Sequence, residues 1–305
     1  MFRTVLLRRP ATAAAAAVAS ASIATLASHH YASQADSAPA HGLDPTKFTP
    51  LKLTKVTPIS DNTAVYRFAY DNPEATSGMT VASCLVVKAA IGSEKPDGTR
   101  ANVIRPYTPI SRPDVPGYLE LAVKTYVQGK MSAHIAKLKV GDTLDFKGPI
   151  LKLPYKPNQY KEIGMVAGGT GIAPMLQVVD QILDDKSDRT KVSLIFANQT
   201  ENDILMKKEI DARVAANPDK LKVYYVVDKA SSWLWKGGQG YVTEEMLKAH
   251  MPKPSKESMV YVCGPPPMYK AICGPKGTKE DPKAQGELGG LLKQMGYEQS
   301  SVFKF

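Results

Sequence analysis

The chain has 305 residues, a length that suits two domains, and its 43% hydrophobic and 22% charged residues are ordinary for a globular protein. Its three cysteines, none in CxxC spacing, and its five histidines form no metal-ligand pattern, which excludes a structural zinc or an iron–sulfur cluster; we expect no metal. The net charge of +10 favours an acidic partner or an anionic membrane, or serves solubility alone, and no dense basic run with interleaved aromatics indicates nucleic-acid binding.

The N-terminal segment differs in composition from the rest. Residues 1–10 contain three arginines and no acid, and residues 11–28 are uncharged and dominated by alanine. This pattern predicts a mitochondrial targeting sequence, with a secretory signal as the alternative. The uncharged run is long enough to span a membrane but only weakly apolar, so both anchoring through residues 11–28 and cleavage stay open. We therefore expect a targeting or anchor segment at 1–35, followed by a Pro-, Ala- and Gly-rich linker at 36–47.

The next segment, 48–153, has the pattern of a β domain. Runs rich in β-branched and aromatic residues, several alternating with period two, predict strands at 52–56, 64–68, 81–87 and 118–127. One helix is expected at 132–139, and Gly148-Pro149 should close the last strand. Short strands separated by turn signals predict an antiparallel barrel, here of six strands.

From residue 154 the pattern alternates between strand and helix. Strands are predicted at 163–167, 192–197, 221–227 and 259–263, and helices at 174–184, 203–215, 243–250 and 287–295. Repeated strand–helix–strand units predict a doubly wound parallel sheet, so the fold class is an all-β barrel followed by an α/β domain at 154–305.

Two strings in the barrel segment carry chemistry. The first is Arg105-Pro106-Tyr107-Thr108, in which a forked guanidinium that fits a diphosphate stands beside an aromatic face. The second is Gly129-Lys130-Met131-Ser132, which opens the lone helix, where free N–H groups favour an anion. Either string alone also fits a proline-bracketed turn or an ordinary helix start.

Two further strings follow predicted strands of the second segment. Gly168-Gly169-Thr170-Gly171-Ile172-Ala173-Pro174 stands where a nucleotide-binding loop belongs, although Pro174 replaces the third glycine of the dehydrogenase pattern and no Walker A lysine follows. Cys263-Gly264-Pro265 begins the other string, whose cysteine alone would also fit a buried structural role.

Together, in this order, the four strings resemble the flavin reductases of the ferredoxin–NADP reductase superfamily, and within it the NADH–cytochrome b5 reductase family. The resemblance covers residues 48–305. It implies an FAD-binding barrel at 48–153 and an NADH-binding domain at 154–305, with hydride transfer at their seam.

The resemblance also implies roles for individual residues. Thr108, Thr170 and Cys263 would be the catalytic residues, beside flavin N5 and the nicotinamide. The FAD-binding residues would be Arg105, Pro106, Tyr107, Thr108, Lys124, Tyr126, Gly129, Lys130, Met131 and Ser132. The NADH-binding residues would be Gly168, Gly169, Thr170, Gly171, Pro174, Asp228, Cys263, Gly264 and Pro265.

Two details refine the expectation. Asp228 matches a family position near the adenosine ribose, where a carboxylate would repel a 2′-phosphate, so NADH is expected over NADPH. Residues 77–85 lack the Gln-His pair that many family members carry there, so a proton relay assigned to that segment is in doubt. Residues 274–286 are expected to form a surface loop.

The resulting hypothesis is that NADH passes a hydride to FAD, which releases single electrons to a heme protein, most simply cytochrome b5 or a similar acidic partner. The alternatives are another single-electron flavin reductase, serving a ferredoxin, oxygenase or nitrate-reductase-like partner, and a membrane-tethered nucleotide-binding protein with an inactive site. We expect a monomer at the mitochondrial outer membrane or in the intermembrane space.

Overall fold

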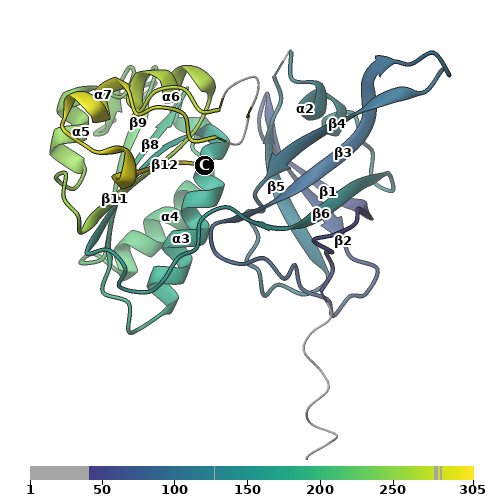
Figure 1. The fold of residues 1–305 in the computed structure, drawn as a ribbon, viewed down its shortest axis with the longest axis horizontal. Helices are drawn as coiled ribbons and strands as arrows, with labels where there is room; N and C mark the ends of the chain where they lie inside the picture. Colours follow the sequence, from purple (N-terminus) through teal and green to yellow (C-terminus); the bar gives the residue numbers. More distant parts are fainter. Residues whose placement is uncertain (1–40, 127, 278–280, 282–283) are drawn as a thin grey trace, which may run out of the picture. The chain divides into compact units, whose positions relative to one another are not determined.

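The computed structural model describes residues 41–126, 128–277, 281 and 284–305 (Figure 1). The expected anchor at 1–35 and the first part of the expected linker lie outside these residues. The remainder of the linker lies against the first sheet: Leu43 is buried in its core, and Gly42 N–H donates to the Thr76 carbonyl at 2.7 Å. Within the described residues, no helix combines the length and apolarity that crossing a bilayer requires.

The first half of the described chain forms a six-stranded antiparallel sheet in the order β4-β3-β6-β1-β2-β5. Alternation places one face of each strand inside, as in β5, where Leu119, Leu121 and Val123 are buried. The core is completed by Phe68 and Phe146, whose ring centroids are 4.8 Å apart. The elements are β1 (Thr49–Ser60), β2 (Thr63–Ala69), β3 (Ser83–Glu94), β4 (Arg100–Tyr107), β5 (Tyr118–Lys124), α2 (Lys130–Ile135) and β6 (Thr143–Leu151).

The second half forms a six-stranded parallel sheet in the order β10-β9-β8-β7-β11-β12. Its strands are β7 (Glu162–Gly168), β8 (Lys191–Asn198), β9 (Leu221–Val227), β10 (Gly238–Gln239), β11 (Ser258–Cys263) and β12 (Val302–Lys304). Its helices are α3 (Ile172–Asp184), α4 (Lys207–Ala216), α5 (Glu244–His250), α6 (Pro266–Ile272) and α7 (Gly290–Gln294). Three single 3-10 turns complete it: η1 (Gly169–Gly171), η2 (Glu201–Asp203) and η3 (Gln299–Ser301).

Helices cover both faces of the parallel sheet (Figure 1). Residues of α3 and α4 share a core with Ile163 and Met165 of β7, whereas residues of α5, α6 and α7 share a core with Val166. This double coverage explains why β7 reads as a continuous apolar run rather than an alternating one. The predicted barrel-type β domain followed by a doubly wound sheet is confirmed.

Several element boundaries differ from expectation for local reasons. The helix expected to begin at Asp203 begins at Lys207, because Thr200 and Asp203 form a capping box around η2 and Met206 adopts a left-handed conformation. The strand β6 continues through Gly148-Pro149 to Leu151. Helix α6 was not expected; Pro266 stands at its first position, where a missing N–H costs nothing.

Candidate active site

The strand order creates a topological switch point between β7 and β11. These strands are paired, yet the chain leaves β7 toward β8 and returns to β11 on the other side. Ligands of doubly wound sheets bind at the carboxyl ends of the strands at such a point. The two glycine-containing strings stand at those ends, with Gly168 closing β7 and Cys263 closing β11.

The approach of these two loops requires a glycine at position 171. A Cβ atom there would collide with the main-chain carbonyl of Cys263, which cannot move as a flexible side chain could. At Gly168 a Cβ would meet the Met268 sulfur at 2.7 Å. Gly169 has a φ of +54° and open space around it, so it presents its backbone to the pocket without a side chain. The Gly168–Gly171 backbone is therefore open to close approach by a ligand, as expected for a nucleotide-binding loop.

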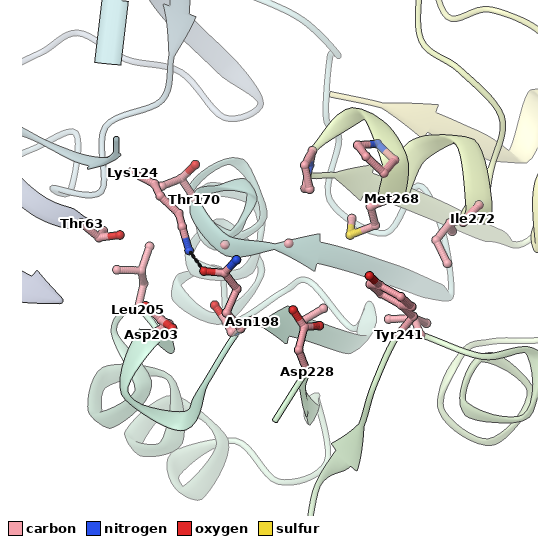
Figure 2. A pocket seen from close by; sticks show the side chains of 18 of the residues that line it. Thr63, Lys124, Thr170, Asn198, Asp203, Leu205, Asp228, Tyr241, Met268 and Ile272 are labelled. Carbon is pink, nitrogen blue, oxygen red and sulfur yellow. Dashed lines mark hydrogen bonds between the residues drawn. The ribbon is translucent and has the colours of Figure 1, made fainter. Parts of the chain in front are cut away.

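A cavity of about 430 Å³ lies at this point and is lined by residues of both sheets (Figure 2). It brings together seven of the predicted site residues: Lys124, Tyr126, Gly168, Gly169, Thr170, Asp228 and Pro265. It also contains Met268, the end of the string that begins at Cys263, and residues that the sequence motifs did not identify, among them Thr63, Asn198, Asp203, Leu205 and Tyr241.

A direct contact joins the two sheets at this cavity. Lys124, the last residue of β5, donates a hydrogen bond through Nζ to Gln199 Oε1 at 2.9 Å, just beyond the end of β8 (Figure 2). Thr63 is paired with Lys124 across β2 and β5. Burial tends to raise the pKa of Asp203, but hydrogen bonds, led by that from Thr200, and the charge of Lys124 outweigh it and hold the pKa below its ordinary range. Asp203 is thus a carboxylate at neutral pH, and it lines the cavity together with the basic side chain of Lys124.

Asn198 supplies the sharpest indication of a ligand. Its side chain is only 8% exposed, lines the cavity at the end of β8, and neither amide atom has a hydrogen-bond partner among the described residues. Buried amides are normally paired, because an unpaired one loses its hydration without compensation. One donor and one acceptor side by side fit the hydroxyl and amide groups of a nucleotide. Together with the open Gly168–Gly171 backbone, they make the cavity suitable for a dinucleotide.

Cys263 is held in a neutral form at the end of β11. Burial raises the pKa of its thiol, so it is protonated at neutral pH. Behind it, Tyr269 of α6 donates a hydrogen bond to the main-chain oxygen of Phe305 at 2.6 Å, and Phe305 N–H donates to the Val262 carbonyl at 3.0 Å. This arrangement favours a shape-defining role for Cys263 over a nucleophilic one. Phe303 and Phe305 pack edge-on against the buried Tyr261.

The predicted flavin residues of β4 lie outside this cavity. Arg105 is exposed and donates to the Ile104 carbonyl, and Pro106 is exposed beside it. Tyr107 packs at the edge of the barrel core, where burial raises its pKa to about 12 and keeps its hydroxyl protonated. Thr108 follows directly and is half-buried.

The second flavin string starts α2, which contacts β3, β4 and β5. Ser132 Oγ donates to the Gly129 carbonyl at 3.1 Å and accepts from Tyr126 N–H at 3.3 Å, so the hydroxyl shapes the loop that leads into the helix. Met131 is buried in the barrel core and Lys130 is exposed. The string thus stands beside β4, the strand that carries the first flavin string, and leaves Lys130 accessible to an anion.

Two further predicted residues, Pro174 and Gly264, do not line the cavity. Pro174 is buried in the first turn of α3, and Gly264 is packed against Met268. The individual binding and catalytic roles stay predictions for all of the residues named. Among the described residues, no group of three His, Cys, Asp or Glu side chains is placed to hold a metal ion.

Comparison with known proteins identifies the class. Residues 50–155 match the family model for the oxidoreductase FAD-binding domain, and residues 165–274 match that for the oxidoreductase NAD-binding domain. With the barrel, the doubly wound sheet and the switch-point cavity, these matches define a flavin- and NAD-dependent oxidoreductase of the ferredoxin–NADP reductase type. FAD and NAD are its cofactors, as predicted.

Relatives narrow this to one family. An NADH-cytochrome b5 reductase-like protein of Arabidopsis thaliana is 44% identical over 88% of this chain and 80% of its own length. The NADH-cytochrome b5 reductase 2 of Aspergillus clavatus is 48% identical over 84% of this chain and 76% of its own length, and that of Candida albicans is 46% identical over 86% and 84%. The chain belongs to the NADH–cytochrome b5 reductase family.

Solved structures agree. The cytochrome b5 reductase domain of Ulva prolifera nitrate reductase has a TM-score of 0.73 and 31% identity, covering 87% of this chain and all of that one. A ferredoxin NADP+ reductase of Neisseria gonorrhoeae, solved with FAD and NADP, has a TM-score of 0.61 at 21% identity, covering 85% of this chain and 98% of that one, a likeness of fold alone.

Proposed function

We propose that the chain is an NADH-dependent reductase of cytochrome b5 or of a similar acidic heme protein. The single observation that carries the proposal is the cavity lined by both sheets, in which β5 of the flavin half and the ends of β7, β8 and β9 of the nucleotide half meet. The printed names of the curated relatives support the acceptor. FAD, when bound, supplies the chemistry that takes a hydride from NADH and releases electrons one at a time.

The residues of the chain position the reactants and select them. The Gly168–Gly171 backbone seats the dinucleotide, and Thr170 offers a hydroxyl at the nicotinamide end. Neutral Cys263 shapes the nicotinamide slot without attacking the ring. Asp228 is an exposed residue of the cavity lining, and the family resemblance assigns it to the adenosine ribose, where a carboxylate would repel a 2′-phosphate and so favour NADH. Holding the two reactants in contact is the chief contribution of such a site.

The basic surface provides the acceptor specificity in this proposal. A net charge of +10 attracts an acidic heme protein and raises its encounter rate, an effect that added salt screens. The rate of cytochrome b5 reduction should therefore fall as salt rises, whereas reduction of a small neutral acceptor should not. Equal salt dependence for both acceptors would contradict the steering.

The defining experiment is an anaerobic mixing of the FAD-loaded protein with NADH, followed by cytochrome b5. Bleaching of the flavin spectrum and then reduction of the heme support the proposal. Flavin bleaching without heme reduction would point to another acceptor, such as the nitrate-reductase type suggested by the Ulva domain. Failure of the protein to take up FAD would favour the alternative hypothesis of a membrane-tethered nucleotide-binding protein with an inactive site.

The proposed location is the mitochondrial outer membrane or the intermembrane space, and it rests on the basic, alanine-rich composition of residues 1–35. The proposed assembly is a monomer. Expression of the full chain and of a chain lacking residues 1–35, followed by fractionation, tests the location. Mitochondrial recovery of both forms would contradict it.

A further inference from the structure

The loop after β9 contains three hydrogen-bond donors that converge on one anionic oxygen. Glu201 Oε1 accepts from Ser231 N–H at 3.0 Å, from Ser231 Oγ at 3.2 Å and from Ser232 N–H at 2.9 Å. Consecutive backbone N–H groups with an adjacent hydroxyl are a donor set that suits phosphate as well as carboxylate. In this chain the set is taken by a side chain of the chain itself.

The position of this donor set relates it to the nucleotide cavity. Glu201 stands in sequence between Gln199 and Asp203, and the two serines follow Asp228 by three and four positions; Gln199, Asp203 and Asp228 all line the cavity. The two loops are also joined at their bases, where Asp228 N–H donates to the Asn198 carbonyl at 3.0 Å. The donors therefore flank the side of the cavity that Asp228 assigns to the adenosine ribose.

Glu201 is held firmly and stays charged. It opens the turn η2, which the reciprocal contacts of Thr200 and Asp203 fix in place. Hydrogen bonding, first from Ser232 N–H, lowers the pKa of Glu201, so the group is a carboxylate at neutral pH. A carboxylate fixed on these donors both occupies them and repels a second anion.

We propose that Glu201 is a specificity-determining residue that excludes NADPH by occupying the donors its 2′-phosphate would need. The inference rests on the proposed use of NADH at this cavity and adds a second device to Asp228. Asp228 rejects the 2′-phosphate by charge repulsion. Glu201 occupies the donors whose hydrogen bonds to the phosphate could have compensated that repulsion.

The test compares the binding of adenosine 2′-phosphate and adenosine 5′-phosphate to the FAD-loaded protein by calorimetry. In Glu201→Ala the donors become available, so the affinity for the 2′-phosphate should rise about tenfold, the equivalent of one charge-assisted hydrogen bond. The affinity for the 5′-phosphate should stay within about twofold. Glu201→Gln, which keeps an acceptor oxygen on the donors but lacks the charge, should give a smaller gain.

Two further variants distinguish occupation of the three donors by Glu201 from a general loss of order in the loop. Glu201→Ala combined with Ser231→Ala should lose part of the gain, because one of the three donors is gone. Glu209→Ala removes the same charge from exposed α4 and should change neither affinity. The ratio of kcat/KM for NADPH to that for NADH should follow the 2′-phosphate affinity across the series.

Equal changes in the affinities for the two adenosine phosphates in Glu201→Ala would show that Glu201 only holds the two loops together, and would overturn the proposal. Equal gains in Glu201→Ala and Glu201→Gln would show that charge alone matters and would also overturn it. Failure of the proposed function is distinguishable, because it would appear as a wild-type flavin that NADH does not reduce, whatever the adenosine phosphates do.

Discussion

Replacing Asn198 by leucine should stabilise the ligand-free protein and weaken nucleotide binding at the same time. The side chain is 8% exposed and both its amide atoms lack partners among the described residues. An unpaired buried polar group costs about 1–3 kcal/mol, and leucine has nearly the same size without that cost. The free energy of unfolding of the FAD-loaded, nucleotide-free protein should therefore increase by about 1–3 kcal/mol.

The same substitution, Asn198→Leu, should weaken the binding of NAD+. If Asn198 pairs with the nucleotide, leucine removes those hydrogen bonds and leaves ligand groups unpaired in the cavity. The affinity for NAD+ should then fall at least about tenfold, or about 1.4 kcal/mol. Thermal unfolding without nucleotide and calorimetric titration with NAD+ measure the two effects separately. A midpoint shift of about 2–4 °C per kcal/mol is expected for a chain of this size.

A matched control exists in Asn217, whose Nδ2 donates to the Arg213 carbonyl at 3.0 Å at the end of α4. Asn217→Leu removes a hydrogen bond that is made, so it should destabilise the protein and leave NAD+ affinity unchanged. The reasoning about Asn198 is refuted if Asn198→Leu lowers the stability of the nucleotide-free protein, or if it leaves NAD+ affinity intact.

Three further predictions follow from single contacts. Gly171→Ala should weaken NAD+ binding by about tenfold or more, because the new Cβ meets the Cys263 carbonyl and one loop must shift; calorimetry checks this, and unchanged affinity would mean that the loops adapt freely. Alkylation of the Cys263 thiol should be slow at pH 8 and accelerate only above the ordinary thiol pKa of 9.0, because burial raises the pKa of this group. Bound NAD+ should suppress the reaction, and mass spectrometry of the labelled peptide measures both effects. Rapid labelling at pH 7 would contradict a neutral thiol. Lys304 is fully buried, and burial lowers its pKa below the ordinary 10.5. Just below pH 10.5 the folded protein therefore binds fewer protons than the unfolded chain. The free energy of unfolding should rise with pH in that range. Denaturant titrations of the wild type and of Lys304→Met between pH 8 and pH 10 should show a smaller rise in the variant, and equal slopes would assign the effect to another group.

The sequence predicted the two-domain architecture because periodicity is a local property. In β5 the buried Leu119, Leu121 and Val123 alternate along the strand, whereas β7 is apolar from Ile163 to Gly168, which distinguishes a strand buried on one face from a strand buried on both. Boundaries were less predictable where side chains competed with the helix. The delayed start of α4 depends on the Thr200–Asp203 capping box and on a left-handed Met206, neither of which apolar spacing encodes.

The site was predictable where the backbone itself forms it. Gly171 must be glycine because of a main-chain contact, and such positions leave a visible string in the sequence. Asn198 and Thr63 were missed because their importance comes from the ends of separate strands meeting in space. The burial of Lys304 depends in the same way on distant residues, because its Nζ donates to the Pro275 and Glu287 carbonyls at 3.0 and 2.8 Å, and this pairing permits its burial.

The charges around the cavity also give the dinucleotide a direction. Lys124, bonded to Gln199, brings a cation from the flavin half to the cavity, whereas Asp228 places a carboxylate at the end of β9. In the proposed complex a pyrophosphate would be drawn toward the cation, and the uncharged ribose hydroxyls could pair with the carboxylate, so the adenosine end would be directed toward Asp228. The nicotinamide would then be left at Thr170, near Cys263. A nucleotide bound in the reverse direction would bring adenine instead of nicotinamide to the flavin, so the charges proposed to reject a 2′-phosphate would also favour the orientation that hydride transfer requires.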